Sequence, residues 1–471
     1  MPLILGTNSI KDTGYDVANS LRLDEPSNQG LSKTPSGAGN RKTFTISVWL
    51  KRSKITNQTG DVQGVIESRA DSNDNCGIIF NTDDTLLVKL KIGGTNAKLI
   101  TNRVFRDVSA WYHIVVAVDT TQSTNSNRNK LYINGVQETS FGTEQYPSQD
   151  AQTSFNNTVA HAVGKRTDVT SQNFDGYLTE VVMIDGQALD PTSFGEFDSD
   201  SPNIWKPIDV SGLTFGTNGF HLDFENASSL GADVSGNSNN FTVNNLTSVD
   251  QSTDTCTNNF ATLNPLDKAI VGTQPTFSHG NLQWLASSNS SSNSSVRGTM
   301  GVSSGKWYFE AKFIESSATV LGYHLDGNNP IYDSTGYSGN NAGFYGISID
   351  GSDNSDKFVA GSETNSNFGT ISNNDIVGVA FDLDNNKFYF SKNGSWLNSG
   401  DPTSGATGTG SFGNLASGTY LPIVFSNSYN TASNTSFNFG SPAFAISSGN
   451  SDANGHGNFE YAVPSGYFSL C

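Results

Sequence analysis

Cysteine and basic residues are scarce in this sequence of 471 residues, and long apolar runs are missing. Its three cysteines, Cys76, Cys256 and Cys471, are too widely spaced for a disulfide framework or a zinc knuckle. We expect them to be free thiols in a protein made in a reducing cytosol. The apolar run at residues 3–5 follows no basic region, and no later segment approaches a membrane-spanning length. We therefore expect neither a signal peptide nor membrane insertion.

The shortage of cations leaves a formal net charge of −18, with 26 Lys and Arg against 44 Asp and Glu. Lysine and arginine never form a run longer than two residues, as at 41–42 and 51–52. A nucleic-acid backbone and an anionic membrane surface both require clustered cations, so we expect neither as a partner.

The composition also indicates the fold class. Charged residues make up only 15% of the chain, which excludes coiled coils and charged linkers. Abundant Ser, Thr and Asn, together with 48 Gly, favour turns over helices. Hydrophobic residues reach only 35%, but an aromatic content of 11% argues against disorder. The sequence therefore predicts an all-β chain with many loops.

Strand patterns recur along the chain. Residues 44–51 (FTISVWLK) alternate in polarity, whereas residues 111–118 (WYHIVVAV) are apolar on both faces, as in a central strand. Residues 130–133 lead into Asn134-Gly135, a pair that favours a tight hairpin turn. Further strands are expected at residues 176–184, 306–313, 375–381, 387–392, 420–425 and 436–439. Short strands separated by turns predict antiparallel sandwiches.

Five segments in the first 200 residues resemble the laminin-G-like branch of the concanavalin A-like jelly-roll superfamily. They are residues 20–23, 44–51, 111–113, 131–135 and 174–188. A second set is similar to a SPRY domain, another β-sandwich: residues 305–310, 375–384, 388–394, 421–422 and 438–440. The two resemblances imply two concanavalin A-like/jelly-roll β-sandwich domains in tandem.

The domain boundaries follow from the change of motif family. We predict an N-terminal arm at 1–17, a laminin-G-like sandwich at 18–198, a connector at 199–255 and a SPRY-like sandwich at 256–471. The connector contains Pro202 and Pro207 and is less regular than its neighbours. Within it, residues 230–242 (LGADVSGNSNNFT) resemble the opening motif of another laminin-G-like domain. This motif is either a remnant or a strand that joins one of the two sandwiches.

Four phrases resemble large structural proteins of marine tailed phages. They are residues 15–20 (YDVANS), 38–43 (AGNRKT), 258–265 (NNFATLNP) and 464–467 (PSGY). The resemblance implies a homo-oligomeric virion protein (tail fibre, appendage or capsid decoration) with other virion proteins and host-surface glycans as partners. One alternative is a cytosolic SPRY-type protein-binding adaptor, although the zinc pattern of a companion RING or B-box is missing. The other is a glycan-degrading enzyme.

Enzymatic activity is not expected. Glycosidases of this superfamily place two carboxylates across the scissile bond, and the nearest pairs here are Glu180 with Asp185 and Glu196 with Asp198. Neither pair has the E-x-D-x-x-E form, and no nucleophile elbow, zincin helix or Walker loop is present. The six histidines are scattered, and His113 lies in an apolar strand, as a packed core residue would. We therefore assign no catalytic residue.

Calcium is the one candidate cofactor, and no metal ligand is assigned. Residues 71–75 (DSNDN), 233–240 and 350–356 are oxygen-rich loops of the kind that calcium prefers. The EF-hand pattern fails in the first loop, because Cys76 replaces the required Gly and Thr82 the bidentate Glu. Asp, Asn and Gly also simply form turns, which is the reading we favour there and at residues 382–386.

Glycan binding is the activity that the superfamily resemblance implies. With a net charge of −18, we expect that adhesion to use neutral sugars, or divalent ions that bridge negative groups. Sugar rings stack on aromatic side chains while polar groups satisfy their hydroxyls. Tyr323, Tyr332, Tyr337 and Tyr345 lie among Gly and Asn and form the densest aromatic segment of this kind. The alternative is that these tyrosines pack over the end of a sandwich.

Overall fold

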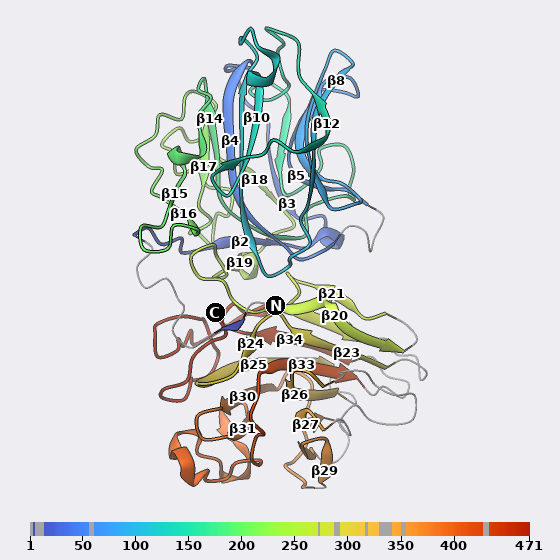
Figure 1. The fold of residues 1–471 in the computed structure, drawn as a ribbon, viewed down its shortest axis with the longest axis vertical. Coiled ribbons are helices and arrows are strands. Elements are labelled where there is room, and N and C mark those ends of the chain that lie inside the picture. The colour runs from blue at the N-terminus through green and yellow to red at the C-terminus, as the bar shows by residue number, and fades with distance from the viewer. Residues whose placement is uncertain are drawn as a thin grey trace. The chain divides into compact units, whose positions relative to one another are not determined.

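The computed structural model describes residues 3–4, 14–55, 61–271, 274–286, 293–315, 319–328, 342–349, 355–364, 366–426 and 433–471. The chain forms two compact units (Figure 1). The first unit is Asp12–Asn259, and the second is Phe260–Cys471 together with Met1–Lys11. Both are built from β-sheets, which confirms the predicted all-β sandwich class. Where the structure describes the chain, its helices are too short or too polar to cross a membrane.

The first unit contains two eight-stranded sheets, which we call sheet 1 and sheet 2. Sheet 1 has the order β11-β10-β9-β4-β14-β2-β19, with β17 paired to β14. Its strands are β2 (Ser20–Leu23), β4 (Thr43–Arg52), β9 (Trp111–Asp119), β10 (Asn129–Ile133), β11 (Val136–Gln137), β14 (Gly176–Asp185), β17 (Phe220–Leu222) and β19 (Gln251–Ser252). The hairpin predicted at Asn134-Gly135 joins β10 to β11, and both residues have positive φ, at 48° and 78°.

Sheet 2 has the order β12-β8-β7-β6-β5-β13-β3-β18. Its strands are β3 (Gly30–Lys33), β5 (Gln63–Arg69), β6 (Asn75–Phe80), β7 (Thr85–Ile92), β8 (Thr95–Val104), β12 (Phe141–Gln145), β13 (Ala160–Val163) and β18 (Thr242–Asn244). One apolar cluster holds side chains of both sheets, such as Ile46 and Val48 of sheet 1 with Ile78 and Val88 of sheet 2. Since alternate residues of each strand enter this core, the intervening ones form the outer faces.

Residues 199–255 contribute strands to the first unit. β16 (Trp205–Pro207) pairs with β15 (Gly195–Phe197). Strands β17 and β19 belong to sheet 1, and β18 belongs to sheet 2. Phe220, Leu222 and Phe241 from this segment lie in the main core. The 230–242 motif is mostly turn, but Leu230 and Phe241 enter the core and Thr242 begins β18, which pairs with β3. The motif is therefore part of the first sandwich, as the second of the two interpretations has it.

The second unit also contains two sheets. One has the order β1-β24-β33-β26-β27-β28-β29 with β23 and β20 beside β33, and the other β21-β22-β34-β25-β30-β31-β32. The first comprises β1 (Leu3–Ile4), β20 (Leu263–Val271), β23 (Asn293–Gly298), β24 (Gly301–Val302), β26 (Thr319–Leu325), β27 (Phe344–Ile349), β28 (Lys357–Val359), β29 (Ser362–Thr364) and β33 (Tyr420–Ser426). The second comprises β21 (Thr276–Ser278), β22 (Gln283–Ala286), β25 (Lys306–Glu315), β30 (Ile376–Asp382), β31 (Lys387–Lys392), β32 (Ser395–Trp396) and β34 (Ser433–Asn438).

The predicted arm at 1–17 is described only in part. Leu3–Ile4 forms β1, which pairs in parallel with β24 of the second unit. Residues 5–13 lie outside the described part of the chain. Residues 14–17 belong to the first unit, where the backbone N–H of Val17 donates to Thr257 Oγ1.

Candidate functional site

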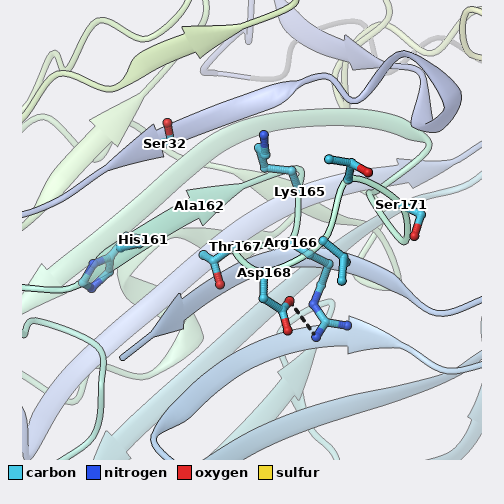
Figure 2. Close-up of a pocket in the computed structure, with 11 residues that line it drawn as sticks. Ser32, His161, Ala162, Lys165, Arg166, Thr167, Asp168 and Ser171 are labelled. Atoms are coloured by element: carbon cyan, nitrogen blue, oxygen red, sulfur yellow. Dashed lines mark hydrogen bonds and ion pairs between the residues drawn. The ribbon is translucent and has the colours of Figure 1, made fainter. Parts of the chain in front are cut away.

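Two pockets lie on the outer face of sheet 2. The larger has a volume of about 700 Å³ and is lined by Ser32 of β3, residues 160–162 of β13 and the loop 165–171 (Figure 2). The smaller has a volume of about 310 Å³ and is formed mainly over β6, β7 and β8. It is lined by Val62, Ile79, Asn81, Leu87, Lys89, Asn96, Lys98, Ile100 and Arg166. Arg166 lines both pockets, so the loop 165–171 stands between them.

The period-2 pattern of the strands places these side chains on the outer face. In β7, Leu86, Val88 and Leu90 enter the core, so Leu87, Lys89 and Lys91 point the other way. In β8 the same alternation buries Ala97 and Leu99 and turns Asn96, Lys98 and Ile100 outward. The pockets therefore lie over the polar side of two amphipathic strands.

The pairing register aligns the outer side chains in rows across the sheet. One row is polar and runs from β3 to β8 through Ser32, Ala162, Glu67, Gly77, Lys89 and Lys98. The neighbouring row is mainly apolar and runs from β5 to β8 through Gly64, Ile79, Leu87 and Ile100. An apolar strip thus lies beside hydrogen-bonding groups on one rigid surface.

Glu67 holds the loop 165–171 in place above the sheet. Its side chain is buried, and its Oε1 accepts the Nε–H of Arg166 at 3.0 Å. Its Oε2 accepts the backbone N–H and the hydroxyl of Thr167 at 2.8 and 2.7 Å. A Cβ on Gly64 would lie 2.7 Å from Cδ of Arg166, so this position must lack a side chain for the arginine to pass. The loop is therefore fixed before any ligand arrives.

Asp168 connects the loop to a second arginine. Its Oδ1 lies 3.4 Å from Nη2 of Arg166, and its Oδ2 lies 2.9 Å from Nη1 of Arg69 (Figure 2 shows the contact with Arg166). Glu67 and Asp168 thus compensate the two guanidinium groups. Burial, and then repulsion from Arg166, lowers the pKa of Lys89, although attraction by Glu67 partly offsets this.

His161 lines the larger pocket and has a structural role there. Its Nε2 accepts the backbone N–H of Asn156 at 3.2 Å, so Nδ1 carries the proton and donates to the carbonyl of Val159 at 2.8 Å. Burial lowers the pKa of His161 to about 4, which keeps the ring neutral near pH 7.

The carboxylates considered from the sequence are engaged elsewhere. Oε2 of Glu180 lies 2.9 Å from Nε2 of His221, and Asp185 accepts the backbone N–H groups of Asn40 and Asn218 at 2.7 and 3.0 Å. Neither side chain lines either of the two pockets on sheet 2.

The second pair of carboxylates shares one cation. Glu196 and Asp198 lie 3.5 and 3.3 Å from the ammonium group of Lys206. Asp198 also accepts the backbone N–H groups of Asp200 and Ser201. Both carboxylates therefore stabilise the local β15–β16 segment.

The oxygen-rich loops use their carboxylates to form turns. Asp71 accepts the backbone N–H groups of Asn73 and Asp74, and Asp233 accepts those of Ser235 and Asn239. Of the 350–356 loop, residues 350–354 lie outside the described part of the chain. Across the described ranges, no three or more His, Cys, Asp or Glu side chains are grouped to hold a metal ion.

The remaining sequence candidates are core residues where the structure describes them. His113 is buried: its Nδ1 accepts the indole N–H of Trp205 at 2.9 Å, so Nε2 donates to Ser47 Oγ at 2.8 Å. This confirms the packed position expected for His113. Tyr323 and Tyr345 are buried in the second unit, which favours the packing interpretation for these two; Tyr332 and Tyr337 lie outside the described residues.

The sequence interpretation missed Glu67, Lys89, Lys98 and Arg166. Consecutive runs do not reveal the cations of a sheet surface, because a strand gathers them at alternate positions and across neighbouring strands. The available signal was the segment 85–92 (TLLVKLKI), which places Lys89 and Lys91 on one face. The contact between Glu67 and Arg166 had no local signal.

Part of the first unit matches a known family. Residues 26–193 match the family model of the concanavalin A-like lectin/glucanases superfamily. The matched residues lie within the first unit, and they include the strands and the loop that line both pockets. No curated protein matches the chain.

Solved structures show weaker similarity. The SPRY domain of human HERC1 is 12% identical with a TM-score of 0.29, covering 37% of this chain and 96% of that domain. A Bacteroides ovatus ATCC 8483 protein to which carbohydrate binding is ascribed is 16% identical with a TM-score of 0.32, covering 49% of this chain and 59% of its own. The heptameric SAP-like pentraxin of Limulus polyphemus is 15% identical with a TM-score of 0.27, covering 37% and 79%. At these values the similarities add nothing to the fold described above.

Proposed function

We propose that the protein binds a glycan on the outer face of sheet 2 and does not cleave it. The observation that carries this proposal is the loop 165–171, which buried Glu67 fixes between two pockets on that face. A site that is ordered before its ligand arrives avoids the entropy cost of ordering a loop on binding. The match of residues 26–193 to a superfamily of lectins and glucanases supports the same ligand class.

The chemistry of the face suits a sugar chain. Leu87 and Ile100 are the partly exposed members of the apolar strip, and they offer a surface for the C–H face of a sugar ring. Asn96 and Arg166 in the smaller pocket, and Thr167 and Ser171 in the larger one, supply groups that hydrogen-bond to hydroxyls. Volumes of about 310 and 700 Å³ lie in the range of small-molecule sites.

The carboxylates of the face favour binding over hydrolysis. A glycosidase needs two carboxyl groups free to face the scissile bond, one as the acid and one as the base or nucleophile. Glu67 and Asp168 are each engaged by an arginine, and Glu67 also by Thr167. We therefore propose a binding protein rather than an enzyme.

The proposal extends to location. The phrases at residues 15–20, 38–43, 258–265 and 464–467 support a place on the virion of a tailed phage, where a glycan-binding face would serve host attachment. Mass spectrometry of purified particles tests this. Detection of the chain at a stoichiometry fixed relative to the capsid protein is expected, and its absence from particles of a phage encoding it would contradict the location.

Glycan binding is tested by blocking the larger pocket. Ser171 is exposed and lines that pocket, so Ser171→Trp adds a bulky ring there without disturbing the core. Ser123→Trp is the matched control, because Ser123 is also exposed and lines neither pocket. On a glycan array, we expect the wild-type and control proteins to bind the same glycans and Ser171→Trp to lose at least tenfold in affinity. Equal binding by all three would contradict the assignment of the face.

A further inference from the structure

Given the proposed glycan-binding function, we infer that the ligand is an anionic glycan whose carboxylate or sulfate groups contact Lys89 and Lys98. These lysines lie directly opposite one another on β7 and β8, and both line the smaller pocket. Two ammonium groups so placed provide a joint site for one negative group.

The placement of Lys89 opposite Lys98 lowers the stability of sheet 2. Like charges directly opposite one another on neighbouring strands destabilise a sheet. The chain has 44 acidic residues against 26 basic ones, so acidic residues are plentiful. Nevertheless, among the described residues the structure gives no ion pair to Lys89, to Lys98 or to Lys91, the next outward residue of β7. A cluster that costs stability and lacks a partner in its own chain is explained by a ligand of opposite charge.

The surrounding groups leave the excess positive charge in place. The carboxylates nearest to Lys89 and Lys98, Glu67 and Asp168, are engaged by Arg166 and Arg69. Lys91 stands in the row formed with Asn75 of β6 and Asn96 of β8, which carry no charge. Lys91 also attracts the carboxylate of Asp71 and helps to lower its pKa, so the ammonium groups without a nearby free carboxylate are those of Lys89 and Lys98.

The lysines lie beside a strip that suits a ring. Leu87 and Ile100 are paired with one another and are two residues from Lys89 and Lys98 on their own strands, on the same face. A sugar ring that rests on Leu87 and Ile100 thus places an attached carboxylate or sulfate over the ammonium groups. This arrangement requires a ligand with both a sugar ring and an attached negative group. A neutral sugar lacks the negative group, and a free anion lacks the ring.

This assignment differs from the neutral sugars expected from the net charge of −18. Exposed charges more than about 10 Å apart are largely screened at an ionic strength near 0.1 M. The electrostatic attraction of a ligand on sheet 2 therefore depends on the nearby lysines rather than on the net charge of the chain.

The test uses the full-length chain and acidic polysaccharides with matched neutral forms. The probes are polygalacturonate and alginate with their carboxyl-reduced forms, and chondroitin sulfate with its desulfated, carboxyl-reduced form. Binding is measured by calorimetry at 50 and 300 mM NaCl. The test variant is Lys89→Gln with Lys98→Gln, and the control with equal charge is Lys130→Gln with Lys357→Gln, placed on β10 and β28. Circular dichroism checks that the wild-type protein and both double variants are folded.

We expect at least one acidic polymer to bind more than tenfold more tightly than its neutral form, more weakly at 300 mM NaCl. The Lys89/Lys98 variant should lose at least tenfold in affinity for that polymer while the control keeps it. Equal binding of acidic and neutral forms, unaffected in the lysine variant, would overturn the anionic assignment and leave glycan binding intact. Failure to bind any acidic polymer or any glycan of an array would overturn both.

Discussion

The guanidinium of Arg166 donates from Nε to the buried carboxylate of Glu67 at 3.0 Å, although the two residues are 99 positions apart in the sequence. The contact joins strand β5 to the loop 165–171 and so defines the wall between the two pockets. Because Glu67 also accepts two hydrogen bonds from Thr167, one carboxylate determines how the loop is placed.

Glu67→Gln should destabilise the first unit and loosen the loop. The amide keeps the volume but loses the charge, and it leaves a donor of Arg166 or Thr167 without an acceptor. Loss of a hydrogen bond to a charged group costs about 2 kcal/mol, so we expect the free energy of unfolding in urea to fall by that amount. Asp150→Asn is the control, because Asp150 pairs with Lys42 on the surface, where such pairs contribute about 1 kcal/mol or less. Similar losses in both variants would contradict the role given to Glu67.

Gly135→Ala should destabilise the protein more than Gly93→Ala. Both glycines have positive φ, at 78° and 53°, where an alanine costs about 1–2 kcal/mol. A Cβ on Gly135 would also lie 2.3 Å from the ring of Trp205, whereas one on Gly93 meets no atom within 4 Å. Overpacking costs roughly 1–3 kcal/mol more, so the free energies of unfolding of the two variants, measured by chemical denaturation, should differ by that amount. Indistinguishable unfolding curves would show that Trp205 moves aside freely.

A fragment of residues 12–259 should fold by itself, while a fragment of 18–198 should not. The shorter one lacks β16 to β19 and removes Phe220, Leu222 and Phe241 from the core. Each buried phenylalanine contributes about 3–5 kcal/mol, and a whole domain is stable by only about 5–15 kcal/mol. Circular dichroism should show one cooperative melt for 12–259 and none for 18–198. Equal melting temperatures would mean that residues 199–255 are dispensable to the sandwich.

Asp175→Asn should flatten the dependence of stability on pH. Burial, and then the charge of Asp24, raises the pKa of Asp175 to about 7 from an ordinary value of 3.8. Between about pH 4 and pH 7 the folded state therefore binds more protons than the unfolded state, and the free energy of unfolding falls as the pH rises.

The effect of one such proton is at most about 1.4 kcal/mol per pH unit. Urea unfolding of the fragment 12–259 at pH 4.5, 6 and 8 measures it, with the curves of the wild-type fragment and the Asp175→Asn variant compared as differences. We expect the wild-type fragment to lose stability relative to the variant as the pH rises. Parallel curves would contradict a raised pKa at this carboxyl group.

Long strands with clear alternation could be predicted from the sequence, and the site could not. Residues 44–51 became the central strand β4, and Asn134-Gly135 forms the hairpin turn between β10 and β11. β13 and β18 have four and three residues, too few to show a period, and pairing with distant strands determines them. The same holds for the site, where the register of β7 against β8 brings Lys89 opposite Lys98.

The parallel pairing of Leu3–Ile4 with Gly301–Val302 has a consequence for the order of folding. The first unit is inserted between two segments of the second, so the polypeptide crosses between them twice. During synthesis, β1 leaves the ribosome before any residue of the first unit, while its partner β24 follows only after that unit is complete. Since domains fold as they emerge, the first unit closes first, and β1 must stay unpaired throughout. Vectorial synthesis thus makes the unit that contains the earliest strand the last to be finished.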